Sequence, residues 1–145
     1  MKKSFFLVLG LLIIFGSVVI FLKNPKITEE EGSLVIGGTE VKVEIADTDL
    51  ERSQGLSGRE GLLPNHGMLF VFDAPGYHAF WMKDMKFPID IIWINADSKV
   101  VWIEKNLSPE TYPNLFRPKE PAKYVLEVPA GFAEEHGVVI GSVVQ

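Results

Sequence analysis

Cysteine is absent from the 145-residue sequence, and clustered positive charge is scarce. Without cysteine there is no disulfide, no thiolate metal site and no lipid attached to a cysteine. Residues 32–145 carry ten Lys and Arg against sixteen Asp and Glu, and no basic run in the chain exceeds two residues. Because nucleic-acid backbones select for clustered positive charge, the sequence predicts no nucleic-acid partner.

The common motifs of enzymes and metal sites are missing as well. His66, His78 and His136 show none of the spacings that are typical of zinc ligands. Ser57 lies in the sequence Gly-Leu-Ser-Gly, which differs from the G-x-S-x-G pattern of a nucleophile elbow. No phosphate-binding glycine loop or dinucleotide fingerprint is present. We therefore expect no cofactor and no metal, and a non-enzymatic protein is favoured over an enzyme.

One long apolar run is present near the N-terminus. Phe5 to Leu22 comprises 18 residues without a charge, which as a helix would span about 27 Å, close to the ~30 Å core of a bilayer. A cleaved signal usually has a shorter apolar region and a small-residue cleavage site, and a soluble helix would need a polar face. The run therefore predicts an uncleaved membrane anchor, with secretion after signal cleavage as the alternative.

This run divides the chain into two parts. Residues 1–31 are predicted to form the anchor and a short polar spacer, and residues 32–145 a single β-rich domain. Two lysines precede the apolar run and two follow it, so charge alone sets little preference for orientation. Since a helix this close to the N-terminus usually leads the chain outward, we expect an extracytoplasmic domain on a single-pass membrane protein.

The domain alternates short apolar runs with turn residues, which is typical of β-strands. Strands are predicted over residues 34–36, 41–45, 68–72, 77–82, 89–95, 99–105, 123–128, 138–140 and 142–144. The pair Gly37-Gly38 predicts a hairpin between the first two. Many short strands without long covering helices favour a mainly antiparallel β-sandwich or a half-closed, jelly-roll-like barrel.

Only short helices are expected. Thr48 and Glu51 fit a capping box for a helix over residues 49–54, and one helical turn is expected over residues 132–136. A long loop should follow the first helix over residues 56–65. Four prolines within residues 108–121 predict an irregular segment there.

Several blocks of residues, in this order and spacing, resemble domain-of-unknown-function family 192. They are Glu51-Arg52-x-x-Gly55-Leu56, Arg59, Gly67-Met68-Leu69-Phe70, Phe80-Trp81-Met82-Lys83, Pro88-Ile89-Asp90 and Pro121-Ala122-Lys123-Tyr124-Val125-Leu126-Glu127. The resemblance covers roughly residues 41–144. It implies one compact β-rich domain of sandwich or jelly-roll type, often behind a signal or anchor, and it implies no activity. Ser57-Gly58 departs from the bulkier residues that many relatives have before the arginine.

Four of these residues are candidates for ligand binding. Arg52 and Arg59 flank a glycine-rich bend, where two guanidinium groups can bind a carboxylate or a phosphate; alternatively, each holds the fold together through an acidic partner. Trp81 and Lys83 fall on one side of the alternating run 80–83, where an aromatic face and an ammonium can line a ligand site. The alternative is that Trp81 packs between layers.

Two acids lie in apolar strand sequences, Asp90 and Glu127. A buried acid needs a partner or shifts its pKa. The two acids therefore either form a carboxylate pair for acid–base chemistry or make ion pairs with Arg52, Arg59 or Lys83.

Three functions follow from these candidates. The favoured one is a non-catalytic module at the membrane that binds an unknown small molecule or an envelope partner. The alternatives are a structural or accessory envelope protein without a ligand, and an envelope carbohydrate hydrolase that uses the carboxylate pair.

Overall fold

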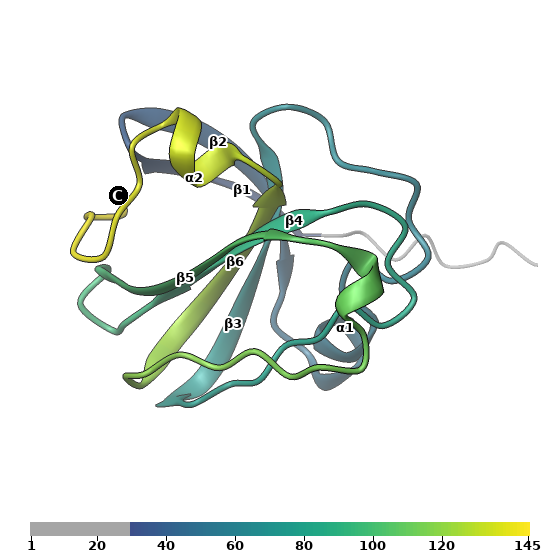
Figure 1. Ribbon diagram of the computed structural model, residues 1–145. Helices are drawn as coiled ribbons and strands as arrows, with labels where there is room; N and C mark the ends of the chain where they lie inside the picture. Colours follow the sequence, from purple (N-terminus) through teal and green to yellow (C-terminus); the bar gives the residue numbers. More distant parts are fainter. Residues whose placement is uncertain (1–29) are drawn as a thin grey trace, which may run out of the picture.

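The computed structural model describes residues 30–145. The predicted anchor, Phe5 to Leu22, lies outside these residues. None of the helices in the described part is long and apolar enough to cross a membrane. The elements in chain order are β1 (Glu30–Ile36), β2 (Thr39–Ala46), α1 (Asp49–Gln54), β3 (His66–Gly76), β4 (Ile89–Ile94), β5 (Val100–Leu107), the 3₁₀ helix η1 (Pro109–Thr111), β6 (Ala122–Pro129) and α2 (Phe132–Glu135) (Figure 1).

The strands form one curled six-stranded sheet in the order β1-β2-β3-β6-β4-β5 (Figure 1). The prediction of a mainly β fold with short helices is confirmed, and four of the five strand pairings are antiparallel, as predicted. The described strands nevertheless form one sheet, and not two packed sheets or a closed barrel. The sheet is mixed, because β2 and β3 run parallel. The chain between them, residues 47–65, contains α1 and returns to the starting edge, as a crossover between parallel strands must.

The local predictions near the N-terminal end of the domain are confirmed. β1 and β2 pair in a hairpin across Gly37 and Gly38, which have φ angles of +59° and +75° that suit glycine. At α1, Thr48 accepts from the backbone N–H of Glu51, and the Glu51 carboxylate accepts from the backbone of Thr48. The capping box thus fixes the start of α1 directly after β2.

Two predicted strand regions form other structures. Residues 77–82 make only an isolated bridge between Phe80 and Phe116, although their alternation persists: Met82 is 1% exposed and Trp81 47%. Residues 138–144 make no regular strand. Instead, the backbones of Gln145 and Val35 bond to each other, and Val100 N–H donates to Ser142, so the C-terminal segment links the β1 and β5 edges. Both segments make isolated bridges in place of a continuous ladder of paired residues.

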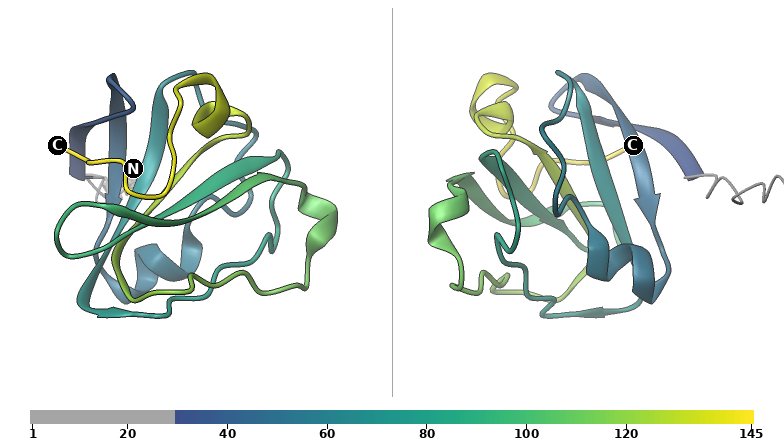
Figure 2. Two further views of the ribbon diagram at one scale, coloured as in Figure 1. Left: turned by 60° about the vertical axis from the view of Figure 1, so that its left-hand side comes forward. Right: turned by 90° about the vertical axis from the view of Figure 1, so that its right-hand side faces the viewer.

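The sheet has a core on each face, and the helices lie at opposite ends of the molecule (Figure 2). On the α2 face the buried side chains are Leu34, Ile36, Val41, Val43, Ile92, Ile94, Val100, Leu126, Val128, Phe132, Ala133 and Val138. On the α1 face they are Ala46, Leu56, Met68, Phe70, Met82, Ile89, Ile91, Trp93, Val101, Leu107, Ala122 and Val125. Successive residues of β4 and β6 alternate between these faces, as strand geometry requires.

Candidate functional site

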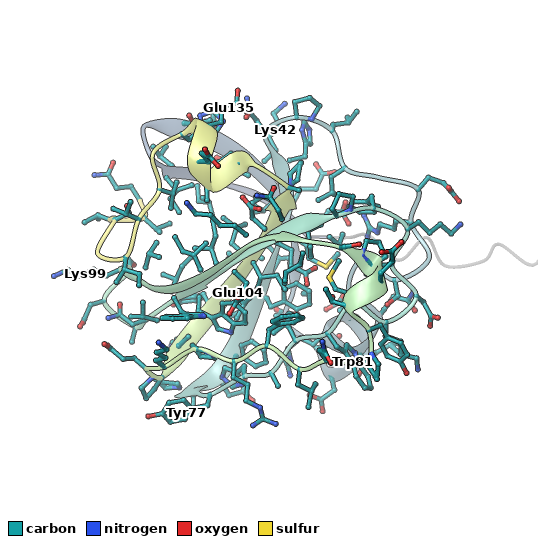
Figure 3. All side chains as sticks on the ribbon, in the orientation of Figure 1. Lys42, Tyr77, Trp81, Lys99, Glu104 and Glu135 are labelled. Carbon is teal, nitrogen blue, oxygen red and sulfur yellow. The ribbon has the colours of Figure 1, made fainter. Side chains whose placement is uncertain are left out.

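A cavity of about 330 Å³ lies on the α1 face, between α1, β3 and the irregular segment that precedes β4. Its lining comprises Asp49, Arg52, Ser53, Gln54, Gly55, Leu56, Ser57, Phe70, Phe72, His78, Ala79, Phe80, Trp81, Met85 and Glu127. Trp81 lies at the end of the molecule away from Glu135 of α2 (Figure 3). The volume is at the lower end of the range for small-molecule sites.

Aromatic side chains form one wall of the cavity. The rings of Phe72 and His78 are stacked with their centroids 3.5 Å apart. Phe80 meets Phe70 edge to face at 4.8 Å and Trp93 at 5.9 Å, so its ring is held from two sides. The rings of this wall therefore support one another through stacked and edge-to-face contacts.

Arg52 of α1 forms the opposite, polar side. Its Nη1 donates to the backbone oxygens of Asp47 and of Val71, the latter at 2.8 Å, and its Nη2 donates to Asp49 at 2.6 Å. The guanidinium also lies 5.4 Å from the centroid of the Phe72 ring. These contacts join α1 to β3. Arg52 therefore holds the cavity wall in place, and its charge already has a carboxylate partner.

Glu127 of β6 is the buried acid of the cavity. Its side chain lies on the α1 face, and the residue is 5% exposed. Among the described residues no donor lies within hydrogen-bond distance of Glu127 Oε2. Burial raises the pKa of the Glu127 carboxyl to about 8, against the opposing influence of the Arg59 guanidinium. The group is therefore mostly a neutral acid at pH 7.

The surroundings of Glu127 explain this state. In the sheet it pairs with Met68 of β3 on one side and Ile91 of β4 on the other, and both side chains are apolar. The guanidinium of Arg59 is bound to Glu44 through two hydrogen bonds of 2.5 Å each. A fork-to-fork pair of this kind aims its donors at Glu44, so Arg59 acts on Glu127 through its charge.

Asp90 has the opposite surroundings. It is fully buried, and its carboxylate accepts from the backbone N–H groups of Asn106 at 2.8 Å, Gly131 at 3.1 Å and Ala133 at 2.9 Å. These bonds fix the end of β5 and the start of α2. In the register Asp90 pairs with Val128, one residue beyond Glu127, so the two acids lie on opposite faces of the sheet.

The predicted carboxylate pair is therefore wrong, because the sheet itself separates Asp90 from Glu127. The alternative prediction, an ion pair with Arg52, Arg59 or Lys83, is wrong for Asp90, whose carboxylate is satisfied by backbone N–H groups. Arg52 pairs with Asp49 and Arg59 with Glu44, and the charge of Arg59 also acts on Glu127.

The structure brings three of the six predicted site residues together: Arg52, Trp81 and Glu127 line the cavity. Arg59, Lys83 and Asp90 are not part of its lining, although the Lys83 ammonium lies 5.8 Å from the Trp81 ring centroid. Sequence reasoning did not assign Phe72 or His78 to the site. The sequence does point to Phe72, since it lies two residues after Phe70 and therefore on the same face of β3.

The fold and the cavity together define a small mixed-sheet protein with a partly aromatic cavity that contains the buried acid Glu127. The model of the family DUF192, described as Uncharacterized ACR, matches residues 32–145. The chain belongs to this family, which confirms the resemblance found in the sequence.

Curated relatives carry names without a stated activity. A UPF0127 protein of Pyrococcus furiosus is 31% identical over 114 residues, which cover 74% of this chain and 90% of that protein. One of Pyrococcus abyssi is 32% identical over 73% of this chain and 86% of its own length. A UPF0127 protein of Thermococcus kodakarensis is 33% identical, and the match spans 55% of its length.

Two crystal structures are similar over 83% of this chain. One, from Sinorhizobium meliloti, is described as a proposed transcription regulator and matches with a TM-score of 0.78, 30% identity and 96% of its chain covered. The other, from Novosphingobium aromaticivorans, is a protein of unknown function, with a TM-score of 0.76, 29% identity and 89% covered. They support the fold of the described domain.

Proposed function

We propose that this protein is a non-catalytic binding module that takes a small molecule into the cavity on the α1 face. One observation carries the proposal: the part of the chain that the structure describes provides no hydrogen-bond partner for Glu127 Oε2. A buried polar atom without a partner destabilises the fold, by about 1–3 kcal/mol. A ligand that fills the cavity and binds this oxygen would remove that penalty.

Binding is favoured over catalysis by the separation of the two acids. A carbohydrate hydrolase of the expected type needs two carboxyl groups about 5–10 Å apart in one groove. Asp90 lies on the far face of the sheet and is committed to three backbone N–H groups. Glu127 therefore serves better as a recognition group than as half of a catalytic pair.

The proposal includes a membrane tether. The uncharged run from Phe5 to Leu22 has the length of a bilayer-spanning helix, and it precedes the domain by a short polar spacer. We propose that this run anchors the domain on the outer face of the membrane. A tethered module of this kind would sample small molecules in the envelope, or present them to an envelope partner.

Blocking the cavity tests the binding function. Ala79 is an exposed residue of the cavity lining, and Ala96 is an exposed residue in the β4–β5 turn. A fragment library is screened by thermal shift with the full-length chain in a mild detergent. We expect hits that A79W abolishes and that A96W, the matched control, retains. If no fragment stabilises the protein, or if every hit also binds A79W, the proposed function is wrong.

Cell fractionation tests the tether. The full-length chain should remain in the membrane pellet after a carbonate wash, and a variant lacking residues 5–22 should not. Protease added to intact spheroplasts should digest the domain of the full-length chain. Recovery of the full-length chain in the soluble fraction with an intact N-terminus would contradict the anchor, and protection from protease would contradict its orientation.

A further inference from the structure

We infer that the ligand of this cavity is an organic amine or amidine, with its cationic head at Glu127 and an apolar body between the aromatic side chains. The inference rests on the proposed function, and it adds the chemical class of the ligand. The charges, the hydrogen-bonding groups and the apolar surface of the cavity each support it.

The charges of the lining leave one acid unmatched. The lining contains Asp49, Arg52, His78 and Glu127 as titratable or charged groups. Arg52 is paired with Asp49 at 2.6 Å, and the nearby Arg59 is paired with Glu44 on β2. His78 is stacked on Phe72, and its Nε2 donates to the backbone oxygen of Ala74. Arg52 and Arg59 each have their own carboxylate, so Glu127 is left as the acid that can ionise to pair with a positively charged ligand.

The hydrogen-bonding groups lead to the same class. Glu127 Oε2, for which the described chain holds no donor, is an acceptor whenever the carboxyl is ionised. An ammonium offers three donors, and an amidinium offers two parallel N–H groups that match both oxygens of a carboxylate. Hydrogen bonds between ionised groups are about twice as strong as neutral ones. The hydrogen bonds to a bound cation thus offset the free-energy cost of ionising the buried Glu127 carboxyl.

The rest of the cavity suits the apolar part of a ligand whose cationic group binds Glu127. Phe72, Phe80, Trp81 and Met85 contribute aromatic and thioether surface to the lining. Rings in this region already accept cations, since Arg52 lies 5.4 Å from the Phe72 centroid and Lys83 lies 5.8 Å from the Trp81 centroid. A compact aromatic or branched aliphatic amine fits a cavity of about 330 Å³.

The proposed binding couples to a proton. Glu127 is mostly the neutral acid at pH 7, because burial raises its pKa to about 8. A cation within contact distance lowers the pKa of a carboxyl. Binding at pH 7 therefore releases close to one proton. A carboxylate ligand would have the opposite requirement, since it would need Glu127 to keep its proton.

Four probes of similar shape test the class: benzamidine, benzylamine, benzyl alcohol and benzoate. Each is titrated calorimetrically into the full-length chain in a mild detergent, in two buffers of different ionisation enthalpy so that released protons are counted. We expect benzamidine and benzylamine to bind at least tenfold more tightly than the other two, with close to one proton released at pH 7. E127Q should weaken benzamidine binding at least tenfold, and E134Q, at an exposed site on α2, should not.

The outcomes separate the two proposals. Tighter binding of benzoate than of benzamidine, or equal binding to E127Q and to the unmodified chain, overturns the ligand class. The proposed function survives that result if A79W still blocks whichever compound binds. If none of the four probes binds and the fragment screen yields no compound sensitive to A79W, both proposals fail.

Discussion

The two faces of the sheet each contain one buried acid, and the two acids are held in opposite ways. On the α2 face Asp90 accepts from three backbone N–H groups and belongs to a closed core. On the α1 face Glu127 borders a cavity, and its Oε2 meets no donor from the described residues. Both are nearly or fully buried, so burial alone does not distinguish an acid with hydrogen-bond donors around it from one that lacks them.

The difference lies in what each acid stabilises. Asp90 joins the end of β5 to the start of α2, so the fold depends on the hydrogen bonds that its side chain accepts. Glu127 Oε2 meets no donor from the described residues, and the surroundings of the carboxyl disfavour its charge, which destabilises the fold at neutral and higher pH. A buried acid that is kept neutral at the cost of stability supports the proposed binding role.

The largest effect is expected for D90A. Removal of the carboxylate leaves three backbone N–H groups without their acceptor, each at a free-energy cost of about 1–3 kcal/mol. We expect the free energy of unfolding to fall by roughly 5 kcal/mol, enough to lower the Tm by more than about 10 °C or to prevent folding. Thermal unfolding followed by circular dichroism measures this change.

Asp97 supplies the control for this variant, since it is exposed in the β4–β5 turn. D97A should change the free energy of unfolding by less than about 0.5 kcal/mol. If D90A is as stable as D97A, the side chain of Asp90 does not stabilise the fold, and the proposed difference between the two buried acids is wrong.

A smaller effect of the opposite sign is expected for E127Q. In the folded protein Glu127 keeps its proton up to a pKa of about 8, whereas in the unfolded chain it loses it near 4.5. Between these values the unfolded state binds fewer protons, so the stability of the unmodified protein falls as the pH rises. The loss approaches about 1.4 kcal/mol per pH unit and totals roughly 3 kcal/mol between pH 5 and 8.

E127Q should lack this part of the pH dependence and be the more stable protein at pH 8. Denaturant unfolding of both proteins at several pH values measures the difference, and subtraction cancels the titration of all other groups. A constant difference in stability from pH 5 to 8 would mean that Glu127 does not titrate as its burial predicts.

Much of the fold is predictable because local patterns determine it. The alternation over residues 41–45, the glycine pair at the hairpin and the capping box at Thr48 each fix a short segment on their own. The sheet topology is not local: β2 and β3 look like any strand pair until the crossover over residues 47–65 is recognised. The prediction of a strand over residues 77–82 failed for a related reason. These residues pair with the distant chain at one position only, the bridge between Phe80 and Phe116.

The site was only half predictable. Asp90 and Glu127 have equally apolar neighbours in the sequence, so both qualified as candidates. Which face each acid occupies follows from the register of β4 with β6, where a shift of one residue would exchange the faces. That register depends on the packing of the whole sheet. The pairing of Arg59 with Glu44 likewise joins segments that no local pattern relates.

The smallest effect is expected for R59Q, which tests how the α1 face sets the state of Glu127. The Arg59 charge opposes the effect of burial, so its removal should raise the pKa of Glu127 further and shift the pH-dependent loss of stability to higher pH. The pair with Glu44 is partly exposed, so its loss should cost at most about 1 kcal/mol. Carbon-13 NMR of the Glu127 carboxyl in both proteins measures the shift. An unchanged or lower pKa in R59Q would show that the charge of Arg59 does not reach the cavity, and that burial alone keeps this acid neutral.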